Sequence, residues 1–320
     1  MNPETRAPAI WLITDNKPGH KNQLKGLGNR LRVLTGASIY WVNAADSPVP
    51  LWRALLGVAP AMDSPPPAPA LIIAAGSGTH RLLLALRRLR KTRTVVLMKP
   101  AFPLAWVDAA IIPAHDNAKA SRKTLITEGV INAVTPMAQL TPKPEALVLA
   151  GGPSRHFVWE DDAVFSQITD LIARYPEWRW TISNSRRTPA ALTAKLDELQ
   201  GPKVTVVHHE NTHDNWLNHQ LAASRAVWVT PDSVSMVCEA ATSGVPTGLL
   251  DLPARGRSRV AKGVTRLVEQ SWVFRWNEHS SVMSEQAERH ARLWEADRAA
   301  RWLTHRFITI PGRANKEAPH

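Results

Sequence analysis

The chain has 320 residues, 44% of them hydrophobic, which suffices for one large core or two ordinary ones; we expect two domains. A single cysteine, Cys238, excludes a disulfide framework and a cysteine-based zinc site. No stretch reaches the roughly 18 consecutive apolar residues of a membrane span, and the first apolar run is too short for a signal peptide. We therefore expect a soluble, cytoplasmic protein. Its formal charge of +12 predicts an anionic partner.

The first part of the chain alternates short apolar runs with helical patterns. The runs are AIWLIT (9–14), ASIYWVN (37–43), LIIAAG (71–76), TVVLMK (94–99) and DAAIIPA (108–114). They are short, apolar and followed by turn residues, which is typical of buried parallel strands. Helices are expected over residues 23–34 and 81–90, and the proline-rich segment 63–70 is a loop.

The segment HRLLLALRRLRKTR (80–93) places leucines on one helical stripe and surrounds them with six Lys and Arg residues. The simpler interpretation is a core-packed helix with a solvated basic face. The alternative is peripheral docking on an anionic membrane, since each basic residue near such a surface contributes about 1 kcal/mol.

The alternation restarts after TPMAQLTPKPEA (135–146), which has the composition of an interdomain linker. The strand candidates are ALVLAGG (146–152), RWTISNS (179–185), KVTVVHH (203–209), AVWVT (226–230) and VPTGLLDL (245–252). Helices are expected over 161–174, 189–200, 216–224 and 234–243, with one or two more over 281–307. The pattern predicts two doubly wound, Rossmann-like α/β domains, residues 1–138 and 139–320; the C-terminal helices are free to pack back on the first domain.

Ligands of such sheets bind beyond the carboxyl ends of the strands, so the strand-to-helix junctions are the candidate sites. Two junctions combine glycines, small hydroxyl residues and arginines, which suit close backbone approach and bidentate phosphate binding. Tight turns and solvated arginines are the alternatives. The candidate binding residues here are Gly151, Gly152, Ser154, Ser185, Arg186 and Arg187.

A third junction, VTPDSVSMVCEAATSGVPTGLLDLP (229–253), carries the strongest signal. Asp232 or Ser233 can cap the following helix, whose first amides are free and carry partial positive charge, as in diphosphate sites. About one turn further on, the carboxylate of Glu239 could accept both hydroxyls of a ribose. The candidate residues here are Thr230, Asp232, Ser233, Ser235, Met236 and Glu239.

This segment resembles the donor-binding segment of GT-B glycosyltransferases, particularly the lipid-linked N-acetylglucosaminyltransferase type. The ordered set TDNKPGHKNQ, PAHD, TEGVIN, GGPS, SNSRRTP and TPDSVSMVCEA resembles the mitochondrial fission ELM-type family, whose bacterial members are often labelled nucleoside-diphosphate-sugar epimerases. The resemblance implies two Rossmann-like domains facing a central cleft, with acceptor on the first, donor nucleotide on the second, and no cofactor or obligatory metal. Cys238 stands where relatives commonly have serine.

The resemblance suggests a catalytic role for the loop ITDNKPGHKNQLKGL (13–27). Glycosyl transfer needs a stabilised leaving diphosphate and, with inversion, a base for the acceptor hydroxyl. His20 or Asp15 could be that base, and the alternative is a polar turn whose histidine caps a helix. Binding residues are expected at Lys17, Gly19, Lys21 and Asn22, with His115 and Asp116 at another strand end.

A zinc site at His208, His209, His213 and Asp214 is disfavoured, because adjacent strand residues point to opposite faces.

The leading hypothesis is transfer of a sugar from a nucleoside-diphosphate donor to a cell-envelope or lipid-linked acceptor, with peripheral contact to the inner membrane. A nucleoside-diphosphate-sugar epimerase and a non-catalytic, membrane-associated scaffold are the alternatives. We do not expect nucleic-acid binding, because the basic residues are not interleaved with aromatics and no recognition motif is present.

Overall fold

The computed structural model describes residues 7–256, 258–284, 286 and 293–308. The chain forms two compact units, one of residues 1–133 and 295–320 and one of residues 134–294. The boundary lies five residues before the expected one. Residues 295 onward belong to the first unit, whereas the prediction assigned them to the second domain and allowed them to pack back.

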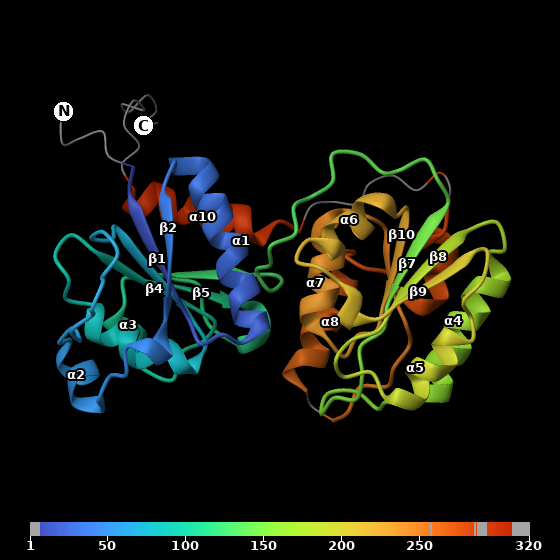
Figure 1. The fold of residues 1–320 in the computed structure, drawn as a ribbon, viewed down its shortest axis with the longest axis horizontal. Coiled ribbons are helices and arrows are strands. Elements are labelled where there is room, and N and C mark those ends of the chain that lie inside the picture. The colour runs from blue at the N-terminus through green and yellow to red at the C-terminus, as the bar shows by residue number, and fades with distance from the viewer. Residues whose placement is uncertain (1–6, 257, 285, 287–292, 309–320) are drawn as a thin grey trace. The chain divides into compact units, whose positions relative to one another are not determined.

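The first unit contains a six-stranded parallel sheet in the order β2-β1-β3-β4-β5-β6 (Figure 1). Its strands are β1 (Ala9–Thr14), β2 (Ser38–Asn43), β3 (Leu71–Ala75), β4 (Arg93–Leu97), β5 (Ala109–Pro113) and β6 (Thr124–Thr127). Its helices are α1 (Pro18–Thr35), α2 (Leu51–Leu56), α3 (His80–Leu86) and α10 (Glu295–Phe307). The sequence analysis did not predict β6 or α2.

Both faces of this sheet are covered, which explains why β1, β3 and β5 are apolar without alternation. Trp11 and Ile13 of β1 lie in the core cluster that includes the leucines of α3, whereas Leu12 lies against α1. The edge strand β2 departs from the prediction of a buried strand, since only Val42 is buried in it. An edge strand has one neighbour instead of two, and its side chains are less covered.

The helix α10 joins the first unit by packing along α1. Asp297 accepts a hydrogen bond from Arg30 Nε at 3.0 Å and another from Arg301 Nε at 2.7 Å. Burial alone would raise the pKa of the Asp297 carboxyl, but its hydrogen bonds to Arg301 and Arg30 and their charges lower it. This ion-pair network connects Arg30 and Asp297, which are 267 positions apart, and fixes α10 on the first unit.

The second unit contains a five-stranded parallel sheet in the order β11-β10-β7-β8-β9. Its strands are β7 (Glu145–Leu149), β8 (Arg179–Ser183), β9 (Val204–Val207), β10 (Ala226–Val229) and β11 (Thr247–Leu249). Its helices are α4 (Asp161–Arg174), α5 (Ala190–Asp197), α6 (Trp216–Ala223), α7 (Val234–Ser243), α8 (Arg259–Glu269) and α9 (His279–Val282). Helix α4 packs on α5, and α7 packs on α6 and α8. The sequence analysis did not predict α8.

The basic segment 80–93 is folded as the simpler interpretation expected. Helix α3 ends at Leu86 rather than at residue 90, and Leu82 to Leu86 are all buried. No helix within the described residues is long and apolar enough to cross a membrane.

Candidate functional site

The strand order of the second unit reverses between β7 and β10, which are neighbours in the sheet although 77 positions separate Leu149 from Ala226. At such a reversal the loops after the two strands leave toward opposite faces and open a crevice at the carboxyl edge of the sheet. The junctions that the sequence singled out after β7 and β10 are these two loops. The third junction, after β8, lies on the next strand.

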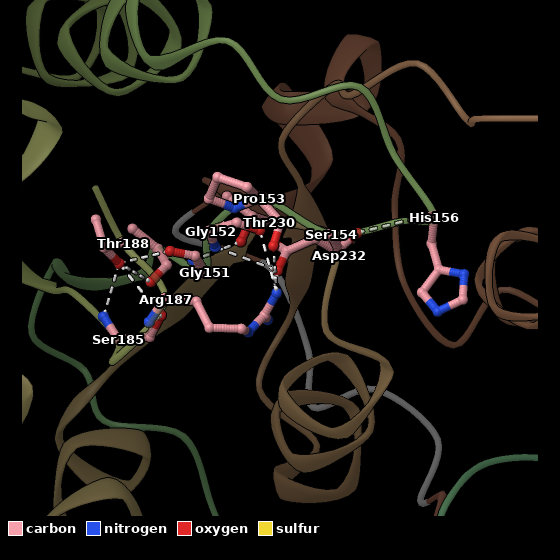
Figure 2. Close-up of polar contacts among 11 residues, drawn as sticks. Gly151, Gly152, Pro153, Ser154, His156, Ser185, Arg187, Thr188, Thr230 and Asp232 are labelled. Atoms are coloured by element: carbon pink, nitrogen blue, oxygen red, sulfur yellow. Dashed lines mark hydrogen bonds and ion pairs between the residues drawn. The ribbon is translucent and has the colours of Figure 1, made fainter.

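Hydrogen bonds tie the three junctions together (Figure 2). The Gly151 N–H donates to Thr230 Oγ1 at 2.7 Å, and the Gly152 N–H donates to Asp232 Oδ2 at 3.2 Å. Arg187 donates through Nη2 to the same Oδ2 at 2.6 Å and through Nη1 to the Gly152 carbonyl at 3.1 Å. The Asp232 side chain is fully buried, whereas that of Arg187 is 43% exposed. The arginine thus joins a buried carboxylate to the surface of the site.

Glycine is needed at the first loop because the three junctions crowd it. A Cβ at Gly151 would lie 2.3 Å from Asp232 Oδ1, and one at Gly152 would lie 1.9 Å from the Arg187 carbonyl oxygen. The sequence analysis expected these glycines to admit a ligand. Within the described structure they admit Asp232 and the backbone of the neighbouring loop.

The amino end of α7 is open. Val237 N–H makes the first intrahelical bond, to the Ser233 carbonyl, and the N-cap Ser233 makes no side-chain cap. The expected cap by Asp232 or Ser233 is therefore wrong, because the Asp232 carboxylate turns to Gly152 and Arg187 instead. Residues 233–236 are half-buried, and their amides carry the positive end of the helix dipole.

Glu239 is half-buried and lies on the same face of α7 as Ser235, because the two residues are four positions apart in the helix. Met236 lies in the same half-buried first turn. Arg186 is exposed at the neighbouring junction. The arrangement offers a positive helix end, hydroxyls, a guanidinium and one carboxylate at a single edge of the sheet.

Ser154 and Ser185 shape their own loops. The Ser154 hydroxyl accepts a bond from the His156 N–H at 3.2 Å, and the Ser185 hydroxyl accepts one from the Arg187 N–H at 3.2 Å. Such local bonds to a backbone N–H are typical of turn residues. Both serines lie at the site, but these hydroxyls already stabilise its loops.

Three residues outside the set of predicted binding residues also contribute to this site. Thr188 donates to the Ala150 carbonyl at 3.2 Å and so connects the loops after β7 and β8. His156 pairs through Nδ1 with the Ser258 hydroxyl at 2.8 Å, and that hydroxyl caps α8 by accepting the Ala261 N–H. Burial, followed by the charges of Arg155 and Arg187, lowers the pKa of His156. No local pattern reveals a contact between residues 102 positions apart.

The first unit also has a reversal of strand order, between β1 and β3, and the Asp15–His20 pair lies at it. His20 is the third residue of α1 and donates from Nδ1 to Asp15 Oδ1 at 2.9 Å. The backbone N–H of Lys17 donates to the same oxygen at 3.3 Å, and the Lys17 ammonium lies 3.8 Å from Oδ2. The side chains of Asp15 and His20 are 9% and 22% exposed. A carboxylate bonded to Nδ1 orients the ring and leaves Nε2 to accept a proton.

The carboxylate of this pair is ionised. Burial alone would raise the pKa of Asp15, but the hydrogen bond from His20, the backbone bond from Lys17 and the charges of both residues together lower it. His80, the first residue of α3, is close enough for the charge of His20, after burial, to lower the pKa of its imidazole.

Gly76, after β3, completes the cluster and was not predicted. A Cβ at this position would lie 2.2 Å from His20 Nδ1 and 2.7 Å from Asp15 Oδ2, and its φ is +91°. Gly78 has a similar role, since its Cβ would lie 3.0 Å from Asp15 Cβ. The glycine-rich segment AAGSGTH directly after an apolar run was the sequence pattern that could have indicated this junction as part of the cluster.

The expected roles of two other residues in this loop stay predictions. Gly19 was expected to permit close approach, and within the described structure nothing lies within 4 Å of its Cβ position. The ammonium of Lys21 lies 6.0 Å from the centre of the Trp41 ring, on β2. Asn22 is half-buried on α1.

His115 and Asp116 lie at the same edge of the sheet but apart from the Asp15–His20 pair. They belong to a 3-10 turn (Ala114–Asp116) after β5, and β3 and β4 stand between β1 and β5. Three strand spacings correspond to about 14 Å. The structure therefore does not bring these residues into contact with the pair.

The zinc alternative is not supported by the arrangement of its residues. His208 Nε2 bonds to Asp197 at 2.7 Å, and the His209 N–H donates to Asn184 Oδ1 at 2.7 Å. In the part of the chain that the structure describes, no group of three or more His, Cys, Asp or Glu is placed to hold a metal ion.

Each unit has a pocket beside its cluster. A pocket of about 530 Å³ in the first unit is lined by residues 47–50 together with Gly78 and Arg81. Asp15 and His20 do not line this pocket, but its lining residue Gly78 has a Cβ position 3.0 Å from Asp15 Cβ. A pocket of about 410 Å³ in the second unit is lined by Pro231, residues 249–252 and α8. Pro231 immediately precedes Asp232 and the open end of α7.

Comparison with solved structures shows the same fold in proteins of low sequence identity. The UDP-GlcNAc 2-epimerase from Methanocaldococcus jannaschii is 13% identical, with a TM-score of 0.55 over 93% of this chain and 99% of that one. The S. aureus MnaA–UDP co-structure is 12% identical, with a TM-score of 0.52 over 97% and 100%. The predicted fold class, two doubly wound Rossmann-like α/β domains of GT-B type, is confirmed for the architecture of the two units.

The sequence comparisons agree with the motif analysis. An uncharacterized protein of Rickettsia prowazekii, RP120, is 24% identical over 331 residues, covering 86% of this chain and 92% of the relative. The family described as Mitochondrial fission ELM1 matches residues 18–307. That match begins at Pro18, so it includes His20 and every junction of the second unit, and the chain belongs to the Mitochondrial fission ELM1 family.

Proposed function

We propose that the protein is an enzyme that uses nucleotide sugars, a GT-B glycosyltransferase that binds the donor's nucleoside diphosphate on its second unit. The observation that carries the proposal is the open amino end of α7. The backbone amides of the half-buried residues 233–236 have no intrahelical partner, and phosphate groups are among the anions that such a helix end binds.

The neighbouring side chains support a nucleotide rather than a simple anion. Arg186 is exposed at the adjacent junction and can pair with a phosphate in bidentate geometry. Glu239 lies one turn along the face of Ser235, where its carboxylate can accept hydroxyl groups of a ribose. Arg187 is held by Asp232, so we assign it to supporting the loop, with its exposed part available to the ligand.

The first unit would supply the base. His20 Nε2 would take the proton of the acceptor hydroxyl, and Asp15 would orient the ring and stabilise the imidazolium. The donor's bond to its diphosphate breaks as the acceptor oxygen forms the new glycosidic bond. The leaving diphosphate would be stabilised by the amides of α7 and by Arg186, so that no obligatory metal is required.

For the acceptor we propose a cell-envelope or lipid-linked hydroxyl compound at the pocket of about 530 Å³ beside the Asp15–His20 pair. The fold similarity to UDP-GlcNAc 2-epimerases keeps epimerisation as the second candidate, because that chemistry also begins by releasing the diphosphate from the sugar. A scaffold without activity would not need the open end of α7.

Calorimetric titration with UDP, GDP and UDP-GlcNAc tests nucleotide binding. We expect one of them to bind, and Glu239→Ala to weaken the binding by about tenfold or more, since a hydrogen bond to a charged group contributes about 1.5–3 kcal/mol. Glu269→Ala, an exposed glutamate at the end of α8 in the same unit, is the matched control. If none of the nucleotides binds, or if both variants bind as the wild type does, the nucleotide proposal is wrong.

Product analysis separates the two reactions. A transferase should release free nucleoside diphosphate only when a lipid extract is added, and an epimerase should convert the nucleotide sugar without any acceptor. His20→Gln should remove the transfer activity while leaving nucleotide binding unchanged, and EDTA should change neither. Loss of nucleotide binding in His20→Gln would contradict the assignment of the base to the acceptor reaction.

A further inference from the structure

Helix α2 exposes an apolar surface, which we call the α2 patch: Leu51, Trp52, Leu55, Leu56 and Val58. The exposed fractions of these five side chains range from 40% to 56%. Most large apolar side chains of the first unit are buried in its core, so a contiguous set of five on one short segment is unusual. Contiguous exposed apolar patches mark interaction surfaces.

The four helical members share one face of α2. With 100° per residue, Leu51, Trp52, Leu55 and Leu56 fall within an arc of about 140°, and the buried Ala54 lies on the opposite side. Ala54 is the residue that joins α2 to the core cluster of α3. The helix therefore rests on the unit through its smallest side chain and presents its largest ones outward. Figure 1 shows α2 beside α3.

The patch is held in place by the basic segment that follows α3. The Arg87 guanidinium donates to the carbonyls of Ala54 and Leu55 at the end of α2, the second at 2.6 Å, and to Leu84 at 2.8 Å. Burial, followed by the charge of Arg88, lowers the pKa of Arg87. The stem of Arg88 packs on Gly57, which ends α2. The patch is thus a rigid surface of the fold.

The charge around the patch is mainly positive. Residues 47–62 and 80–93 together carry seven Lys and Arg residues, whereas Asp46 and Asp63 flank the first segment and Arg93 is paired with Asp108. The Arg53 guanidinium lies 5.3 Å from the centre of the Trp52 ring, an aromatic–cation pair suited to a water–lipid boundary. A second copy of the chain is disfavoured as occupant, since two such basic patches would repel each other.

We propose that the α2 patch docks the protein on an anionic lipid bilayer. The apolar side chains enter the headgroup region, and the arginines at the rim bind lipid phosphates. The sequence analysis gave docking of the 80–93 segment on an anionic membrane through its basic residues as an alternative. The leucines of this segment pack into or against the core, so the segment contributes its charges while α2 contributes the apolar surface.

Vesicle flotation of the full chain tests the proposal without any nucleotide, so its outcome is independent of the proposed enzyme activity. We expect binding to phosphatidylcholine vesicles that contain phosphatidylglycerol, and little binding to phosphatidylcholine alone. The double variant Trp52→Ser, Leu55→Ser should bind about tenfold or more weakly. Val33→Ser removes a 68% exposed apolar side chain of α1 and should bind as the wild type does.

A charge variant tests the proposal separately, in case the Trp52–Leu55 double variant does not fold. Arg90→Glu with Lys91→Glu alters only exposed side chains, and its binding should also fall and lose its salt dependence. Equal binding of Val33→Ser and the Trp52–Leu55 variant would overturn the proposal. So would a lipid-free wild type that is dimeric by light scattering and becomes monomeric in that double variant, because the patch would then be a protein interface.

Discussion

Gly76→Ala should damage the Asp15–His20 pair although residue 76 has no side chain of its own. The new Cβ would lie 2.2 Å from His20 Nδ1, 2.5 Å from His20 Cε1 and 2.7 Å from Asp15 Oδ2. All three distances are below any real contact, so the imidazole must leave its position. The exposed fractions of Asp15 and His20, 9% and 22%, leave little room for this movement.

The magnitude has two parts. Gly76 has φ +91° and ψ 151°, a backbone region that essentially only glycine adopts, and an L-residue there costs about 1–3 kcal/mol of backbone strain. Losing the bond between His20 and the ionised Asp15 costs about another 1–2 kcal/mol, the lower part of the charged range because His20 is partly exposed. We expect the free energy of unfolding to fall by about 3 kcal/mol, and sugar transfer to be lost with the orientation of the ring.

Urea denaturation of Gly76→Ala and Gly36→Ala separates the two parts. Gly36, which ends α1, has left-handed backbone angles (φ +69°, ψ 11°) and nothing within 4 Å of its Cβ position, so its substitution carries backbone strain without a side-chain clash. We expect a loss of about 1 kcal/mol there and unchanged activity. Equal losses in the two variants would refute the reasoning, because they would mean that residue 76 does not constrain His20.

Two further results are expected. Asp232→Asn should lower the free energy of unfolding by about 1–2 kcal/mol, because it weakens the hydrogen bond from the partly exposed Arg187 but retains the one from Gly152. The control Asp170→Asn, in an exposed ion pair on α4, should change the free energy of unfolding by less than about 0.5 kcal/mol. Similar losses in both variants would show that burial of Asp232 contributes nothing. The His80 imidazole binds its proton more weakly in the folded protein, so the free energy of unfolding should fall as the pH drops below the ordinary pKa of 6.5. His80→Gln should flatten this pH dependence in urea titrations between pH 5 and pH 7. An unchanged pH dependence in the variant would show that His80 is not its cause.

Local sequence determined which segments become strands and which junctions carry polar groups. The runs that form β1, β3 and β5 are continuous and apolar because helices cover both faces of the sheet, and that pattern is legible without a structure. Asp15 and His20 were both predicted as candidate bases because one strand-to-helix turn contains both, and the structure pairs them. The position of Ser235 and Glu239 one turn apart on α7 follows from spacing alone.

The tertiary structure decided everything that depends on strand order. Gly76 reaches the Asp15–His20 pair because β3 lies beside β1, and Asp232 turns away from α7 because β10 lies beside β7 and brings Gly152 near. Likewise, the outward face of α2 could not be predicted, since an apolar stripe reads the same whether a neighbour covers it or not. Strand order and coverage are set by contacts between distant segments, and a local pattern of residue types contains no information about which segments will meet.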